Sequence, residues 1–153
     1  FRCRIAPSVV AGSPLVSTGD LVETVKRGVP AAARRTGGHP AKRVFQAVRI
    51  EVNGELDALG PALAAALDLL APGGRLVTLA YHSGEDRLVK DRFTEAATGG
   101  CVCPPGLPCV CGATPLVRLL NRGARKPSAA EVAANRRAEA ARLRAVEKLE
   151  VTS

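Results

Sequence analysis

The chain has 153 residues, the length of one ordinary domain, and its 46% apolar and 24% charged residues exclude a disordered or collagen-like protein. It contains no run of about 18 apolar residues free of charge, so neither a transmembrane helix nor a membrane partner is expected. The first residues, Phe1-Arg2-Cys3-Arg4, include neither an initiator Met nor a signal-peptide core, and Met is absent throughout. We therefore expect a C-terminal piece of a longer, cytoplasmic protein.

The formal net charge is +8, and it is unevenly distributed along the chain. Residues 1–50 carry nine basic and two acidic side chains, residues 51–116 carry four and eight, and residues 117–149 carry nine and three. Two basic regions flanking an acidic one are expected if nucleic acid is bound at both ends of the chain, although solvated helix faces explain the charges equally well. One Tyr, three Phe and no Trp argue against a base-stacking platform for single strands.

The first half of the chain has helical patterns. Residues 17–20 offer an N-cap, Glu23 follows Asp20 by three residues, and the helix is expected to end near Gly28-Val29-Pro30. Residues 34–38 predict a basic loop. A second helical pattern begins at His39 with Pro40 in its first turn and ends at Pro72-Gly73-Gly74, with a kink or break expected at Gly60-Pro61.

The helix that begins at His39 has one polar face, because residues 39, 42, 43, 46, 49, 50 and 53 share a side at helical spacing. A helix N-terminus beside Arg, Lys, Gln and Asn side chains can hold phosphates and read polar base edges. The candidate substrate contacts on this face are His39, Arg43, Gln46, Arg49 and Asn53. A solvated helix face remains the alternative.

Residues 75–81 form the clearest strand pattern, and a polar string follows it and leads into a helix. Ser83 is expected to cap this helix, with Asp86 as its acidic partner. Ligands bind at the carboxyl ends of strands in open α/β sheets, which makes His82, Ser83, Asp86 and Arg87 further candidates for substrate binding. A serine hydrolase is disfavoured because no Gly-x-Ser-x-Gly elbow surrounds Ser83.

Two Cys-x-Cys pairs lie in the loop after this helix: Cys101, Cys103, Cys109 and Cys111. Four thiolates could bind zinc tetrahedrally, but structural sites usually space each pair by two to four residues. In an extended stretch the cysteines of each pair would also point to opposite sides. Unliganded, reduced thiols are therefore favoured over zinc, and disulfides are least favoured because Cys3 is a fifth cysteine.

The C-terminal region offers a strand at residues 115–120 and then an Ala-rich helix. Ser128, with Glu131 three residues later, predicts the N-cap of that helix. Helix propensity alone would extend it to Leu149.

Several of these strings, in this order, resemble the motifs of one family, the MraW-like bacterial 16S rRNA cytosine-N(4) methyltransferases. They are the run from His39 to Asn53 followed by Glu55-Leu56, Pro72-Gly73-Gly74-Arg75-Leu76, His82-Ser83-x-Glu85-Asp86-Arg87-x-Val89-Lys90, Arg125-Lys126-Pro127-Ser128, and Glu131 to Arg144. The resemblance spans nearly the whole chain. Gly84 stands where the family usually has Leu, and Arg136 where it usually has Pro.

The resemblance implies an α/β fold, the C-terminal half of a class I, Rossmann-like methyltransferase domain. Residues 1–45 would end a helical insert subdomain, and residues 46–153 would belong to the methyltransferase domain. Strands are then expected at residues 75–82, 115–121 and 139–149, the last one antiparallel and contrary to its helix propensity.

The implied reaction is the S-adenosylmethionine-dependent methylation of the N(4) amine of a cytidine in 16S rRNA of the small ribosomal subunit, with no metal required. No Gly-x-Gly-x-x-Gly loop follows a strand in this sequence, so the S-adenosylmethionine site is expected upstream of residue 1 and the isolated chain is expected to be inactive.

Two other functions remain open: a non-catalytic, basic rRNA-binding module and a small zinc-binding interaction protein built around the cysteine loop. The expected sheet would also leave Leu76, Val77 and Leu79 at an open edge with an uncovered apolar face. This feature predicts self-association, for example as a homodimer.

Overall fold

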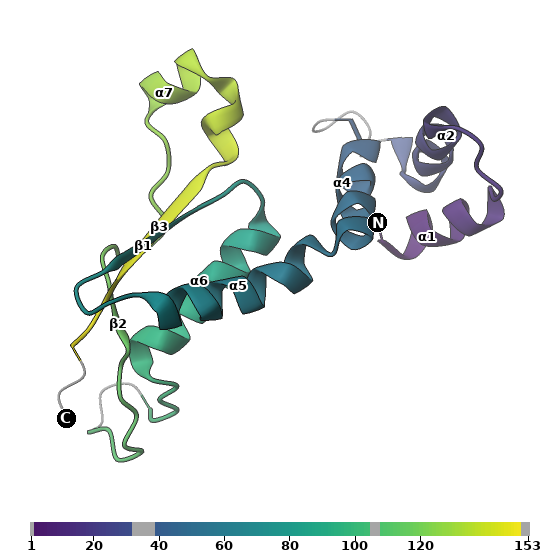
Figure 1. Ribbon diagram of the computed structural model, residues 1–153. Coiled ribbons are helices and arrows are strands. Elements are labelled where there is room, and N and C mark those ends of the chain that lie inside the picture. Colours follow the sequence, from purple (N-terminus) through teal and green to yellow (C-terminus); the bar gives the residue numbers. More distant parts are fainter. Residues whose placement is uncertain (1, 32–38, 105–107, 151–153) are drawn as a thin grey trace. The chain divides into compact units, whose positions relative to one another are not determined.

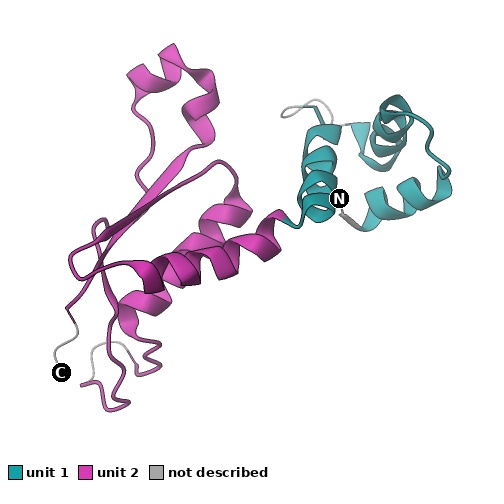
Figure 2. Ribbon diagram, in the orientation of Figure 1, with its two compact units in different colours: residues 1–54 teal, residues 55–153 magenta. Residues whose placement is uncertain are grey.

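The computed structural model describes residues 2–31, 39–104 and 108–150. The chain divides into two compact units, residues 1–54 and residues 55–153 (Figures 1 and 2). The division falls between Gly54 and Glu55, whereas the family resemblance places the end of a helical subdomain at about residue 45. The basic loop expected at residues 34–38 lies outside the described residues.

Helices make up the first unit. They are α1 (Arg2–Ala11), α2 (Thr18–Gly28) and α4 (Ala41–Asn53). Val25, Val29 and Ala41 form its buried centre, with Ile5 and Phe45 among the partly buried side chains packed around them. The expected helix at α2 is confirmed, and its N-cap is Ser17, whose side chain accepts from the Asp20 N–H while Asp20 accepts from the Ser17 N–H. The sequence assigned no element to the region of α1.

The break in the long helical pattern lies at Gly54. The sequence predicted a kink or a break at Gly60-Pro61, and the break does not occur there, because α5 continues through both residues. Gly54 ends α4 with φ of 59°, a left-handed conformation that Gly adopts without steric cost, and α5 (Glu55–Leu69) begins directly after it. Pro61 lies inside α5 and costs that helix one backbone donor. Pro40 is the N-cap of α4, so this helix begins at Ala41, two residues after His39.

The second unit contains an antiparallel sheet in the order β1-β3-β2, formed by β1 (Arg75–Ala80), β2 (Val117–Leu119) and β3 (Arg142–Lys148). The helices α5 and α6 (Ser83–Thr98) lie side by side in this unit (Figure 1). The buried core joins the two helices to the sheet and contains Leu63, Leu67, Val89, Phe93, Ala96, Val117 and Val146. A mixed α/β class is therefore confirmed.

The C-terminal strand forms against helix propensity, as the family resemblance predicted. The Ala-rich helix α7 spans only Ala129–Ala134, with Ser128 as its N-cap, and a 3-10 turn at Arg136–Ala140 leads into β3. The extension of this helix to Leu149 does not occur because Asn135 leaves the helical conformation and Val146 is fully buried in the core. β2 is shorter than the expected strand.

The face of β1 that points away from the core is apolar and exposed. Val77, Leu79 and Tyr81 are 53–56% exposed, while Leu76 on the alternate face packs against the core. Among the described strands, β1 is an edge of the sheet. No helix in the described parts of the chain is long and apolar enough to span a membrane.

Candidate substrate-binding site and a cluster of four cysteines

His82, at the carboxyl end of β1, is the N-cap of α6. Its Nδ1 accepts from the backbone N–H groups of Gly84 (3.2 Å) and Glu85 (3.3 Å). The Glu85 carboxylate accepts in turn from the N–H groups of Tyr81 and His82, which completes a capping box. The expectation that Ser83 caps this helix is wrong, because the ring nitrogen of His82 reaches the same donors and Ser83 is the first helical residue.

The other ring nitrogen of His82 faces carboxylates. Because Nδ1 accepts two hydrogen bonds, the proton of the neutral ring is assigned to Nε2. Nε2 is buried and has no hydrogen bond of good geometry, although Oε1 of Glu85 lies 3.2 Å from it. Glu55, the first residue of α5, brings its carboxylate into the same cluster. His82 and Glu85 already use their other atoms in capping α6, so this cluster fits a helix-capping network better than a metal site.

Asp86 is paired across the unit with Arg144 on β3. The Arg144 Nε lies 2.8 Å from Oδ1 and its Nη2 lies 3.1 Å from Oδ2, so both carboxylate oxygens are occupied. The hydrogen bonds from Arg144 lower the pKa of Asp86 below its usual value, against a smaller opposing effect of burial. The expected role of Asp86 as the acidic capping partner of Ser83 is wrong, since Glu85 occupies that position.

Two exposed residues, Tyr81 and Ser83, flank His82 in the chain, and the exposed Arg87 follows on α6. Arg87 faces Asp91 at 3.9 Å on the surface of α6, and both side chains are largely exposed. An open hollow of about 530 Å³ borders the site, lined by Leu56, Gly84, Arg87, Leu88, Asp91, Arg92 and Glu95. The four candidates thus follow β1 within the first turns of α6, but their side chains do not converge: Asp86 pairs with Arg144 on β3, whereas Arg87 borders the hollow. Sequence reasoning did not single out Tyr81, Glu85 or Arg144 as site residues.

The second group of candidates lies on α4, in the first unit. His39, Arg43, Arg49 and Asn53 are exposed, and Gln46 is half-buried. Arg49 and Asn53 already have partners in the structure. Ala41, Val44 and Phe45 occupy the opposite side and pack into the core of this unit, which leaves the basic side accessible.

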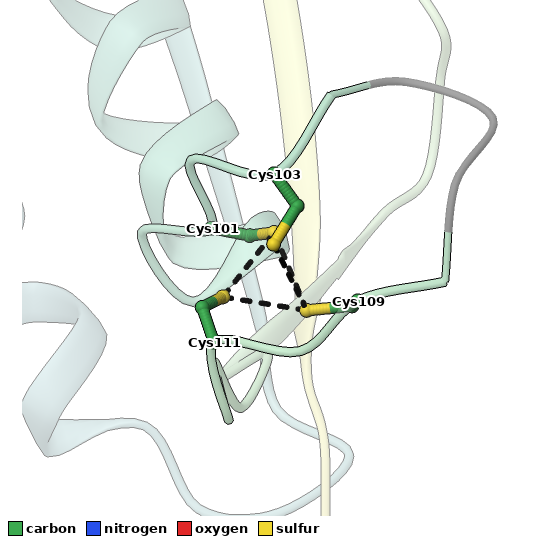
Figure 3. Close-up of side chains that lie close together, drawn as sticks. All are labelled: Cys101, Cys103, Cys109 and Cys111. Atoms are coloured by element: carbon green, nitrogen blue, oxygen red, sulfur yellow. Dashed lines mark hydrogen bonds between the residues drawn. The ribbon is translucent and has the colours of Figure 1, made fainter.

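The four cysteines of the loop after α6 converge on one point (Figure 3). The Sγ atoms of Cys101 and Cys109 are 3.5 Å apart, those of Cys109 and Cys111 3.3 Å, those of Cys101 and Cys111 3.5 Å, and those of Cys103 and Cys109 3.9 Å. The expectation that each Cys-x-Cys pair diverges is wrong, because the chain bends at Cys103 and at Cys111 instead of remaining extended.

The thiols of this cluster also perturb one another. A backbone hydrogen bond from Ala113, supported by bonds from the neighbouring thiols, lowers the pKa of Cys111 to about 6. A backbone hydrogen bond lowers the pKa of Cys101, but the side-chain bonds with Cys109 and Cys111 outweigh it and raise that pKa to about 12.

The sequence model of the MraW methylase family matches residues 1–149. The chain is 56% identical to the ribosomal RNA small subunit methyltransferase H of Acidothermus cellulolyticus, over 99% of this chain and 47% of the relative. It is 55% identical to the protein of that name from Saccharopolyspora erythraea (97% and 46%) and 53% identical to that of Heliobacterium modesticaldum (95% and 48%). The chain spans about half the length of these relatives. With the family match covering almost every residue, the chain belongs to the MraW methylase family.

Proposed function

We propose that this chain is part of an enzyme that transfers a methyl group from S-adenosylmethionine to the N(4) amine of a cytidine in 16S rRNA, acting on the small ribosomal subunit in the cytoplasm. The observation that carries the proposal is the family match over residues 1–149, together with relatives named as small-subunit rRNA methyltransferases. The net charge of +8 suits a polyanionic substrate.

The described residues do not form a recognisable site for S-adenosylmethionine. The N–H groups of Gly84 and Glu85 after β1 are taken by His82 Nδ1, and no glycine-rich loop follows a strand in this sequence. We therefore place the methyl donor on sequence outside this chain, before residue 1. The donor supplies the electrophilic methyl group, and this chain contributes contacts to the RNA.

The strand-end site suits the holding of one extruded base. An exocyclic amine conjugated into the ring is a weak nucleophile, so its alignment and the exclusion of water matter most. A base inside a stem must leave its stack to be aligned in this way. Tyr81 offers an exposed ring for stacking, and the exposed Ser83 and Arg87 on the first turns of α6 offer hydrogen-bond donors.

The exposed side of α4 suits the RNA backbone. Lys42 and Arg43 lie in its first turn, where the N–H groups of the helix also favour anions. Such contacts position the RNA without reading its sequence. The two groups of candidates thus divide into base contacts after β1 and phosphate contacts on α4.

The test is transfer of labelled methyl groups to small ribosomal subunits. Three proteins are compared: this chain alone, this chain joined to the preceding half of the Acidothermus relative, and that intact relative as the positive control. We expect no transfer by the chain alone and transfer by the joined protein, with N(4)-methylcytidine recovered from digested 16S rRNA.

Transfer by the chain alone would overturn the placement of the donor site. A joined protein that binds S-adenosylmethionine and RNA but transfers no methyl group would overturn the proposed activity and favour a non-catalytic RNA-binding module.

A further inference from the structure

The strongest unassigned feature of the chain is the group of four sulfur atoms in the loop between α6 and β2. Four of their separations lie between 3.3 and 3.9 Å, and all four atoms lie within 4.8 Å of one another. Cys101 and Cys103 precede the tip of the loop and Cys109 and Cys111 follow it, so the cluster joins its two sides. A ligand bound by all four sulfurs would produce such an arrangement.

These separations match a single tetrahedral metal ion. A Zn–S bond of about 2.3 Å gives a tetrahedron whose edges are about 3.8 Å. Disulfides require sulfurs about 2.05 Å apart, and all four cysteines are free in the structure. In a four-iron cluster each thiolate binds a different iron, which would hold the sulfurs much farther apart than is observed.

The described part of the loop, residues 99–104 and 108–116, has no apolar core that could hold the sulfurs together. Val102 and Val110, the residues inside the two Cys-x-Cys pairs, are each 88% exposed. At the base of the loop, the Leu116 N–H donates to the Ala96 carbonyl at 2.8 Å, and the backbone of Thr114 lies so close to Gly99 that a Cβ there would clash with it. Four exposed or half-buried thiols thus meet above that base with weak S–H···S contacts between them. A cation bound by their thiolates would hold them together far more strongly.

We infer that Cys101, Cys103, Cys109 and Cys111 bind one Zn²⁺ ion, which fixes the loop between α6 and β2. Tetrahedral sites with four thiolates and no open position are structural, so the ion stabilises the loop and takes no part in methyl transfer. The inference rests on the sulfur geometry alone and is independent of the proposed reaction.

The test is metal analysis of the whole chain, purified with a reductant, loaded with Zn²⁺ and passed through a desalting column. We expect one zinc per chain in the wild type and in Cys3→Ser, whose cysteine is exposed and lies in the other unit. We expect at least a tenfold loss of bound zinc in Cys103→Ser and in Cys109→Ser. Circular dichroism checks that these variants remain folded.

A second measurement on the wild type needs no substitution. Loading with Co²⁺ should give the visible absorption of a tetrahedral thiolate site, and Zn²⁺ should displace it. The inference is overturned if the wild type retains no zinc and shows no such spectrum, if Cys103→Ser retains the zinc, or if the thiols prove to be oxidised to two disulfides.

Discussion

Arg144 on β3 donates two hydrogen bonds, of 2.8 and 3.1 Å, to the carboxylate of Asp86 on the first turn of α6. This ion pair joins the central strand of the sheet to the first turn of the helix that carries the candidate site. Both side chains are half-buried, with exposed fractions of 16% for Arg144 and 23% for Asp86. The pair fixes the orientation of α6 relative to β3, and with it the position of His82 and Ser83.

We expect Asp86→Asn to lower the free energy of unfolding by about 2 kcal/mol, because Arg144 is left half-buried without its counter-charge. Urea unfolding at neutral pH measures this change. Asp91→Asn is the matched control, since Asp91 lies on the same helix in a long, exposed contact with Arg87 and should change stability by less than about 0.5 kcal/mol.

The same pair predicts a pH dependence. The folded-state pKa of Asp86 lies below its unfolded value, so the stabilisation by this pair is complete above the unfolded pKa and is lost as the pH falls through the folded one. The stability difference between the wild type and Asp86→Asn should be constant above about pH 5 and narrow below about pH 4. A difference that persists unchanged into acid would show that packing, and not the charge, is responsible.

Substitutions at His82 separate capping from substrate binding. We expect His82→Ala to destabilise the chain by about 1 kcal/mol through loss of the cap, and His82→Asn to retain most of the stability because Asn is a good N-cap residue. In the protein that joins this chain to the preceding half of the Acidothermus relative, a loss of methyl transfer in His82→Asn at unchanged stability would assign a substrate contact to the ring. Wild-type transfer by His82→Asn would limit His82 to the capping role.

Much of the fold could be predicted from local patterns, and the errors have local causes. β1 and α6 follow from an apolar run between a glycine turn and a polar cap. The break at Gly54 was missed because Pro61 is the stronger sequence signal, whereas packing tolerates a proline inside α5. β3 could not be predicted from propensity, because its pairing with β1 and the burial of Val146 are tertiary effects.

The candidate site was harder to predict than the fold. The position of the site after β1 could be predicted, because ligands of open α/β sheets bind at the carboxyl ends of strands. The pairing of Arg144 with Asp86 could not, because the two residues are 58 positions apart in the sequence. His82 was missed as a cap because only a ring with an unprotonated Nδ1 can accept in that way. The convergence of the cysteines depends on bends at Cys103 and Cys111, whereas the prediction assumed an extended chain in which successive side chains point to opposite sides.

The exposed face of β1 predicts self-association of the isolated chain. Val77 and Leu79 on this edge strand, and Tyr81 directly after it, present exposed apolar side chains. We expect oligomers in analytical ultracentrifugation, and a shift toward monomer in the double variant Val77→Thr, Leu79→Thr. Val16→Thr is the control, because Val16 is 90% exposed but lies outside the sheet. A monodisperse wild-type monomer would contradict this prediction.

The two arginines of α4 should differ in their effects on RNA binding. Arg43 and Arg49 are six residues apart and therefore point about 120° away from each other around the helix, so they cannot contact one phosphate together. Arg43 lies in the first turn, where anions are favoured, and is exposed. Arg49 already has a partner in the structure, which favours a structural role.

We therefore expect Arg43→Ala, in the joined methyltransferase, to weaken binding to 16S rRNA and to reduce the slope of log affinity against log salt by about one, because one phosphate contact is lost. Arg49→Ala should instead lower the melting temperature and leave the salt slope unchanged. Affinity measured over a salt series, together with thermal unfolding of both variants, tests the assignment. If Arg49→Ala keeps its melting temperature and loses RNA affinity while Arg43→Ala changes neither, the face of α4 that meets RNA is the one bearing Arg49.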